Sequence, residues 1–314
     1  MKRKLFRADI IFFSLFVISA VFTLLQLSGR YNPLTRFDTS PPKNERQEEY
    51  EASLSRINSV RKLEVYSDSL YNATYSQINK EADYEKKYSN LLAAIVRKRF
   101  YHGYSEYGFS DNYLLTLFAK ITNAAYNSVI APDDVLKYAY ASCSQQSVVM
   151  MELLNRKNIS TRKVGFLGKK FGGHFSFEAY YNGQWHFFDT NMEPDLAVLN
   201  AYDRPGISFL TQHTELLTTA YRRYNADKIL DIFPKYAYGA VNVFPAPRGL
   251  LFQKITGILS YSLWFFFFIL FIITRRLYKR QTVSNYVWNR RIHFPPFFAG
   301  APSVSHPGHK ASGA

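Results

Sequence analysis

The sequence predicts an α+β domain held between two membrane-spanning helices. Three observations lead to this fold class: two long segments without charge, a lone cysteine at the start of a helix-like run, and an Asn-Gly pair between two strand-like segments. The 227 residues between the uncharged segments are long enough for one domain with additional helices.

The uncharged segments run from Ile10 to Leu27 and from Ile255 to Thr274, over 18 and 20 residues. As helices they reach roughly 27 and 30 Å, enough to cross a hydrocarbon core. Buried core helices rarely run so long without a polar stripe, which disfavours that alternative. The first segment could also be a cleaved signal peptide, but Gln26 to Arg30 lacks a small-x-small cleavage site, so an uncleaved anchor is favoured.

Charge placement predicts the orientation. Basic residues lie at the outer ends of both segments: Lys2, Arg3, Lys4, Arg7, and Arg275, Arg276, Lys279, Arg280. The positive-inside rule then places both termini in the cytoplasm and residues 28–254 outside it, in the periplasm if the source is bacterial. The termini hold eleven of the 39 basic residues and one acid, so most of the net charge of +15 reflects anchoring and no nucleic-acid partner is expected.

These observations divide the chain into segments. We expect a cytoplasmic N-terminus at 1–9, a membrane-spanning helix at 10–27, a linker with amphipathic helices at 28–100, a domain at 101–246, a second membrane-spanning helix at 255–274, and a basic, disordered cytoplasmic tail at 275–314. The linker contains Pro33, Pro41 and Pro42. The helices within 43–100 form either a stalk or part of the domain packing, and Arg97 to Arg99 is interpreted as a solvated helix end.

Helix signals come first within the domain. Asp111 and Asn112 can cap a helix that continues through Ile121, and Pro132 suits the first turn of a short helix. The run from Cys143 to about Lys157 is predicted to be helical. Helical periodicity returns from Ser208 to Tyr224.

The strand signals lie between these helices. Thr161 to Leu167, His174 to Tyr181 and Gln184 to Thr190 are predicted strands, and Asn182-Gly183 predicts a tight hairpin between the last two. A two-residue loop pairs Tyr181 with Gln184. Because side chains alternate along a strand, one face then carries His174, Ser176, Asp189 and Asn191.

The hairpin places His174 and Asp189 as diagonal neighbours whose side chains can meet. The same alternation puts His186 on the opposite face with Phe177 and Ala179, so His186 is a poor candidate for a catalytic base. A core or surface role is expected for it.

Cys143, His174 and Asp189 together supply the groups for thiol-based acyl transfer. A helix N-terminus favours a thiolate, an imidazolium stabilises it, and a carboxylate holds the imidazole in position. The backbone N–H of Cys143 is a natural oxyanion donor. A side-chain donor from Tyr138 or Tyr140 is also conceivable, and the sequence does not choose between them.

Residues from about Asp133 to Pro194 resemble the transglutaminase-like branch of the papain-like cysteine peptidase superfamily. The motifs are Cys-Ser-Gln-Gln at 143–146 opening a helix, Arg-Lys-Val at 162–164, Gly-Gly-His at 172–174, and Asn-Gly-Gln-Trp through Asp at 182–189. The resemblance implies a papain-like core, with the cysteine helix packed on an antiparallel sheet that bears His and Asp. It also implies a Cys143–His174–Asp189 triad. Ser142 departs from the glycine often found before the nucleophile.

The expected function is therefore a membrane-anchored, extracytoplasmic thiol amidase or peptidase acting through a Cys143 thioester on a protein or peptide substrate. A glutamine transglutaminase shares every triad residue. The third hypothesis is a non-enzymatic scaffold of an envelope or surface-polysaccharide assembly, within a membrane-protein complex. No metal or other cofactor is expected, because the histidines show no ligand spacing.

Overall fold

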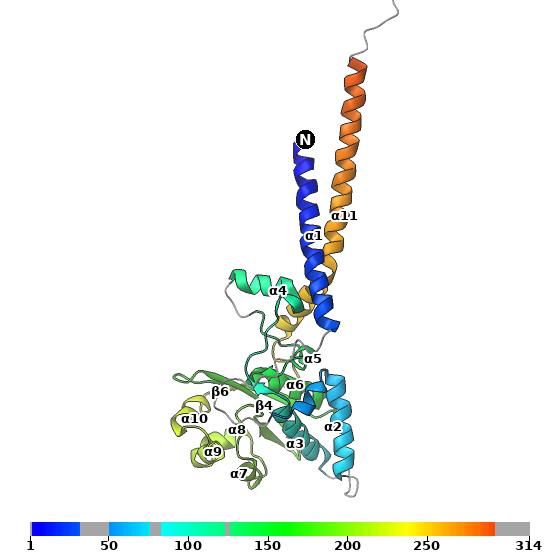
Figure 1. Cartoon of the computed structure of the whole chain (residues 1–314). Helices are drawn as coiled ribbons and strands as arrows, with labels where there is room; N and C mark the ends of the chain where they lie inside the picture. The colour runs from blue at the N-terminus through cyan, green and yellow to red at the C-terminus, as the bar shows by residue number, and fades with distance from the viewer. Residues whose placement is uncertain (1, 32–49, 76–82, 123–125, 293–314) are drawn as a thin grey trace, which may run out of the picture. The chain divides into compact units, whose positions relative to one another are not determined.

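A computed structural model describes residues 2–31, 50–75, 83–122 and 126–292 (Figure 1). The predicted linker with Pro33, Pro41 and Pro42 lies outside these residues. The chain divides into two compact units. The helical unit combines Met1–Ala20 with Ser262–Ala314, and the domain unit is Val21–Tyr261.

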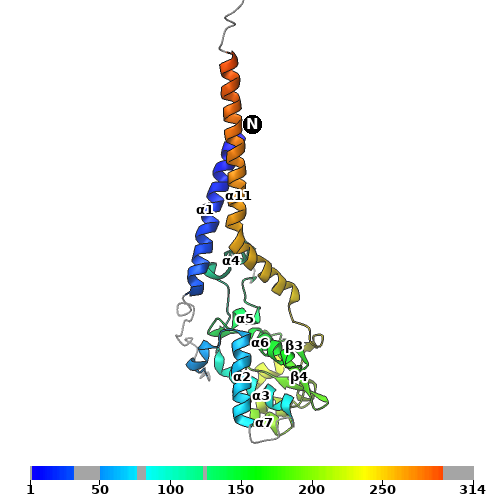
Figure 2. The same cartoon turned by 90° about the vertical axis from the view of Figure 1, so that its right-hand side faces the viewer.

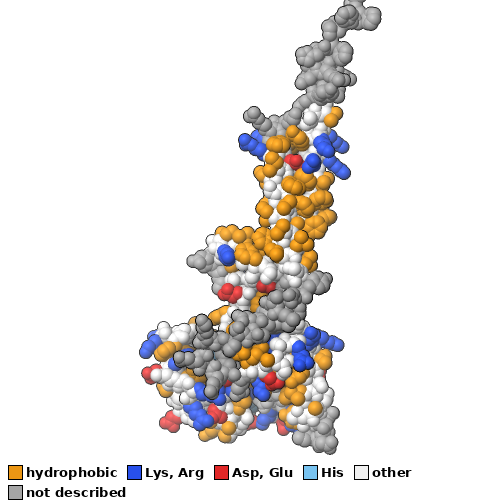
Figure 3. Space-filling model, in the orientation of Figure 1, with side chains coloured by type: hydrophobic (Ala, Val, Ile, Leu, Met, Phe, Trp, Pro, Cys, Tyr) orange, Lys and Arg blue, Asp and Glu red, His pale blue; other side chains and the backbone are white. Residues whose placement is uncertain are grey.

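Two long apolar helices, α1 (Lys2–Tyr31) and α11 (Pro247–Ile292), contribute to both units. Their candidate membrane spans are Lys4–Ser28 and Pro247–Val283, with 17% of each apolar window buried. A core helix would be mostly buried. Figure 3 shows hydrophobic side chains on the exposed faces of these helices. Both helices are therefore candidates to cross a membrane, as the sequence predicts.

The second helix is longer than predicted. It begins at Pro247 and continues to Ile292, so the expectation of disorder is wrong for residues 275–292. The reason is local: Arg, Leu, Lys and Gln are good helix formers, and no glycine or proline interrupts the chain before Pro295. Residues 293–314 lie outside the described part.

A four-stranded sheet forms the centre of the domain unit, in the order β5-β4-β3-β6. The strands are β3 (Thr161–Leu167), β4 (Gly173–Tyr181), β5 (Gln184–Phe188) and β6 (Tyr236–Tyr238), and every pairing is antiparallel. Tyr181 pairs with Gln184 across the Asn182-Gly183 turn, which confirms the predicted hairpin register. Both turn residues have positive φ, 50° and 78°, as a two-residue hairpin loop of this sequence type requires.

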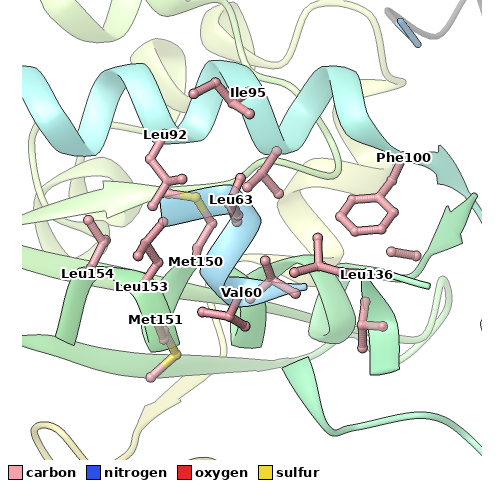
Figure 4. Close-up of a cluster of buried hydrophobic side chains, with 14 of the residues drawn as sticks. Val60, Leu63, Leu92, Ile95, Phe100, Leu136, Met150, Met151, Leu153 and Leu154 are labelled. Carbon is pink, nitrogen blue, oxygen red and sulfur yellow. The ribbon is translucent and has the colours of Figure 1, made fainter. Parts of the chain in front are cut away.

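One face of the sheet packs on the helices α6 (Cys143–Arg156) and α3 (Tyr84–Arg99) (Figures 1 and 2). The helix α2 (Val60–Tyr75) packs on α3 and α6, and η2 (Ala52–Arg56) packs on α3. Figure 4 shows how apolar side chains of α2, α3 and α6 meet in one core; examples are Leu63, Leu92 and Met150. Of the two arrangements left open for residues 43–100, the structure shows packing against the domain in the described part.

Arg99 ends α3 inside this core and is fully buried. Its guanidinium donates hydrogen bonds to the carbonyl oxygens of Ile57, Leu136 and Tyr138, at 3.1, 2.6 and 3.1 Å. Burial lowers the pKa of Arg99 to about 10. The interpretation of this position as a solvated helix end is wrong, because Arg99 is fully buried and its guanidinium is hydrogen-bonded to main-chain carbonyls.

The other face of the sheet is covered by four short helices that follow β5 (Figure 1). They are α7 (Leu196–Asn200), α8 (Ile207–Gln212), α9 (Thr214–Ala220) and α10 (Ala226–Ile232). The single helix predicted from Ser208 to Tyr224 is two helices, because His213 has non-helical φ and ψ of −115° and 69°. Phe166, Phe187 and Phe233 are buried in this second core.

The remaining elements precede α6. The two-stranded parallel pair β1 (Tyr101–His102) and β2 (Tyr140–Ala141) brings the segment after α3 beside the start of α6. Between them lie α4 (Phe109–Thr122) and α5 (Pro132–Val135), the latter with proline in its first turn as predicted.

Candidate active site

Cys143 is the first residue of α6, as the sequence predicts. Ser142 precedes it with extended φ and ψ of −74° and 172°, and its N–H is bonded to Oε1 of Gln145 at 2.9 Å. This is one half of a capping box, a device that fixes where a helix begins. The thiol thus lies at the positive end of a 14-residue helix and is partly exposed.

Gln145 also holds the segment that faces Cys143. Its Oε1 accepts the N–H of Ser105 at 3.0 Å, and its Nε2 donates to the carbonyls of Ser105 and Val129 at 2.8 and 2.7 Å. All of these contacts are buried. A single side chain therefore positions the β1–α4 connection next to the helix N-terminus.

His174 lies near the start of β4, where the register pairs it with Phe166 of β3. Its imidazole stacks against the Phe166 ring and contacts the Phe233 ring, both with centroids 5.8 Å away. Nε2 lies 2.8 Å from Oδ2 of Asp189, and the Cys143 thiol is near enough to the ring to help raise the pKa of His174. Because Nε2 is taken by the carboxylate, Nδ1 is the nitrogen left for the thiol.

Asp189 follows directly after β5, which ends at Phe188 and is two residues shorter than predicted. The physical reason is the Asp189 side chain itself: Oδ1 accepts the N–H groups of Asn191 and Met192 at 3.1 and 3.0 Å and turns the chain. Oδ2 accepts the Tyr221 hydroxyl at 2.8 Å in addition to His174. The carboxylate is thus fixed by four hydrogen bonds.

The pKa shifts of the three groups all favour their charged forms. Burial alone would lower the pKa of His174, but the Asp189 carboxylate and Cys143 outweigh it and raise that pKa to about 10. Burial also opposes ionisation of Cys143 and of Asp189. For Cys143, the hydrogen bond and charge of His174 and the Phe175 N–H prevail and lower the thiol pKa. His174 likewise lowers the pKa of Asp189. The favoured state is therefore a thiolate–imidazolium pair backed by a carboxylate.

Cys143 and His174 open into a cavity of about 230 Å³. The lining residues besides the pair include His102, Tyr104, Phe171, Asn191, Met192, Lys228 and Ile232. A larger cavity, of about 310 Å³, lies among α4, α5 and the first turns of α11. The smaller one is the candidate active site, because only it contains the thiol and the imidazole.

One wall of the candidate active site is fixed by Asp231 of α10. Its carboxylate oxygens accept the N–H groups of Lys169, Lys170 and Phe171, at 3.2, 2.9 and 3.0 Å. These hydrogen bonds, the one from Phe171 first, lower the pKa of Asp231. The β3–β4 loop, which carries Phe171, is therefore tied to the helix that carries Lys228.

Two other sequence expectations have clear outcomes. His186 is fully buried opposite Ala179, stacks on Tyr181, and places Nδ1 2.8 Å from the carbonyl of Arg204, so the expected structural role is confirmed. Neither Tyr138 nor Tyr140 is among the residues that line the cavity of Cys143. Tyr138 lines the larger cavity instead.

Tyr221 and Gln145 are the site residues whose roles the sequence did not reveal. Tyr221 comes from α9's C-terminal end, 32 residues after Asp189, and no local motif marks it. Gln145 belongs to a motif noted in the sequence, and the Ser-x-x-Gln spacing at 142–145 is the signal from which its capping contact could have been found.

Comparison of the chain with protein-family models, with curated proteins and with solved structures finds no match. The resemblance to transglutaminase-like proteins therefore rests on the motif residues and their arrangement. What the structure establishes by itself is a mixed α+β domain with an antiparallel sheet and two candidate membrane-spanning helices.

Proposed function

We propose that this protein is a membrane-anchored thiol acyl-transfer enzyme that hydrolyses amide-linked acyl groups outside the cytoplasm. The observation that carries the proposal is that Cys143 and His174 line the same cavity, with His174 hydrogen-bonded to Asp189. Each member has a pKa shifted in the direction that such catalysis needs. The domain lies outside the cytoplasm if the basic flanks of both spans face inward.

In the first half-reaction, the Cys143 thiolate attacks the carbonyl carbon of a bound amide. The negative charge that develops on the oxygen faces the N-terminus of α6, where the Cys143 N–H is the available donor. The His174 imidazolium then gives its proton to the leaving nitrogen. The C–N bond breaks, a neutral amine departs, and a Cys143 thioester remains.

In the second half-reaction, neutral His174 takes a proton from water, and the resulting hydroxide attacks the thioester. The C–S bond breaks, a carboxylic acid leaves, and the thiolate–imidazolium pair is restored. Asp189 keeps the imidazole in one orientation and one tautomer throughout, because Nε2 stays bonded to Oδ2. Tyr221 and the two backbone N–H groups hold the carboxylate in place.

The test uses the full-length protein in detergent micelles, a mixture of peptides with main-chain and glutamine amides, and a primary-amine probe. Mass spectrometry then distinguishes cleaved peptide, deamidated glutamine and amine adduct. We expect hydrolysis that falls by at least about 10³-fold in Cys143→Ala and His174→Ala. The matched control is His213→Ala, since His213 is exposed, stacks on Phe209 and has Nδ1 2.9 Å from the Phe209 carbonyl.

The outcomes separate the alternatives. Amine adducts in excess of hydrolysis would replace the amidase with a transglutaminase that uses the same triad. Equal product from the native protein and from Cys143→Ala would reject thiol catalysis altogether. In that case the non-enzymatic scaffold would be the better hypothesis, and Cys143→Ala cells should have no phenotype.

A further inference from the structure

Helix α4 has an apolar face that stays largely exposed in the described part of the structure. Leu117, Phe118 and Ile121 have 46%, 41% and 75% of their surface exposed. Their spacing places them on one side of the helix, and Leu115 and Ala119 face the protein on the other side. Figure 3 shows hydrophobic side chains gathered over this helix. The ring contacts of Phe118 with Tyr126 and Phe252 therefore leave much of this face uncovered.

The start of α4 is fixed to the domain-unit end of both candidate spans. Gln26 of α1 donates a hydrogen bond from Nε2 to the carbonyl of Asp111 at 2.8 Å. Asn112 donates from Nδ2 to Oγ1 of Thr256 on α11 at 3.0 Å. The helix has a kink at Asn112, whose Oδ1 then caps the following turn by accepting the N–H of Leu115 at 3.1 Å. The predicted cap thus operates within the helix and redirects it.

Aromatic contacts hold the same arrangement. Phe22 of α1 stacks on Phe109 and Tyr113, with ring centroids 5.7 and 5.0 Å apart. Phe118 lies edge-on against Phe252 of α11 at 5.5 Å. All of these residues belong to the domain unit. Figure 1 shows the result: α4 runs across the end of α1 that belongs to this unit. The exposed face of α4 is therefore held rigidly beside both helices.

The neighbouring parts of α1 and α11 also carry exposed apolar side chains. They are Leu24, Leu25, Leu251, Ile255 and Ile258. The candidate span Pro247–Val283 has 37 residues, roughly 55 Å of helix, against a hydrocarbon core of about 30 Å. If its uncharged part, Ile255 to Thr274, crosses that core, the turns before it extend into the interfacial layer. Lys120 and Lys254 are exposed there, as interfacial cations commonly are.

We propose that α4 is an interfacial helix, with Leu117, Phe118 and Ile121 inserted into the outer lipid layer beside the two spans. The occupant of this face is the bilayer, because lipid must cover the adjoining surface of α1 and α11 if those helices cross the membrane. Insertion of the face by about 5–10 Å is usual for such helices. It fixes the domain unit to the membrane surface at a third point. The inference rests on the anchoring part of the proposed function and is independent of the triad.

The experiment uses full-length protein in phosphatidylcholine vesicles, in a Cys143→Ser background that leaves no native thiol. Single cysteines replace Ile121, Val65 or Phe266, and each carries an environment-sensitive nitrobenzoxadiazole probe. Val65, 56% exposed on α2, is the matched apolar control, and Phe266 reports on the second span. Quenching is measured with spin-labelled lipid and with aqueous iodide.

We expect the spin-labelled lipid to quench the probe at 121 at least about threefold more than the probe at 65, and iodide to show the reverse order. Quenching at 121 by iodide alone, while 266 responds to lipid, would overturn the interfacial helix and leave the anchoring intact. Protection at 121 from both quenchers would assign the face to a protein partner or a second copy and also overturn it. Failure of lipid quenching at 266 would overturn the anchoring and the inference together.

Discussion

Replacing Gln145 with methionine should destabilise the domain more than most single substitutions do. Methionine has a similar length and helix propensity, so the main change is the loss of the amide. Four hydrogen bonds disappear, two to Oε1 and two from Nε2. The carbonyl of Ser105 keeps a bond from the N–H of Val129, but the N–H groups of Ser105 and Ser142 lose this partner in a buried place.

The magnitude follows from the count of bonds. A buried hydrogen bond contributes about 0.5–1.5 kcal/mol net, and an orphaned partner adds a desolvation cost of about 1–3 kcal/mol. Local relaxation and water penetration recover part of this, so we expect the free energy of unfolding to fall by about 3–5 kcal/mol. Gln184→Met is the control, since Gln184 is exposed and its amide lies 3.5 Å from Asp203. That variant should stay within about 0.5 kcal/mol of the parent protein.

Urea unfolding of the full-length protein in micelles measures both variants. Trp264 and Trp288 are first replaced by phenylalanine, so that the fluorescence of Trp185 on β5 reports on the sheet alone. A loss below about 1 kcal/mol for Gln145→Met would refute the reasoning. It would mean that the segment at Ser105 is held by other contacts, and that Gln145 does not fix the position of the cavity wall.

The remaining predictions concern the candidate triad. Tyr221→Phe removes one hydrogen bond to a carboxylate that keeps three others, so the unfolding free energy should fall by about 1–2 kcal/mol, against no change for exposed Tyr202→Phe in the same urea titration. Alkylation of Cys143 by iodoacetamide should remain fast at pH values below the ordinary thiol pKa of about 8.5, because the thiol pKa is lowered. Turnover should fall as His174 loses its proton near pH 10. A thiol pKa above about 8.5 would contradict this prediction. The pKa of Asp189 is lower in the folded than in the unfolded protein, so the carboxylate stabilises the fold above about pH 4. This stabilisation is lost as the pH falls through the folded pKa. Unfolding curves measured at a series of pH values should show that Asp189→Asn lacks this loss at acid pH.

Local sequence signals predicted the part of the site that lies on one hairpin. The Asn182-Gly183 turn fixes the register, and the period of two along a strand then decides which side chains share a face. That is why the sequence alone predicts that His174 and Asp189 share a face and that His186 lies on the opposite one. The start of α6 at Cys143 could also be predicted, because serine, the residue at 142, is favoured at the N-cap of a helix.

Tertiary contacts could not be predicted in the same way. The bond from Tyr221 to Asp189 depends on how four short helices fold back over the sheet, and short helices leave weak periodic signals. Arg99 was misinterpreted because a basic residue at a helix end is usually solvated, and only the surrounding carbonyls show why this one is buried. The strand β6 has three residues, too few for any alternation to be recognised.

The three hydrogen bonds from Lys169, Lys170 and Phe171 to Asp231 have a consequence for how a substrate reaches the thiol. An outward movement of the loop alone would break these bonds, whereas a movement of the loop together with α10 would keep them. If the cavity binds an acyl donor, as proposed, we expect the loop and α10 to move as one body when the entrance widens.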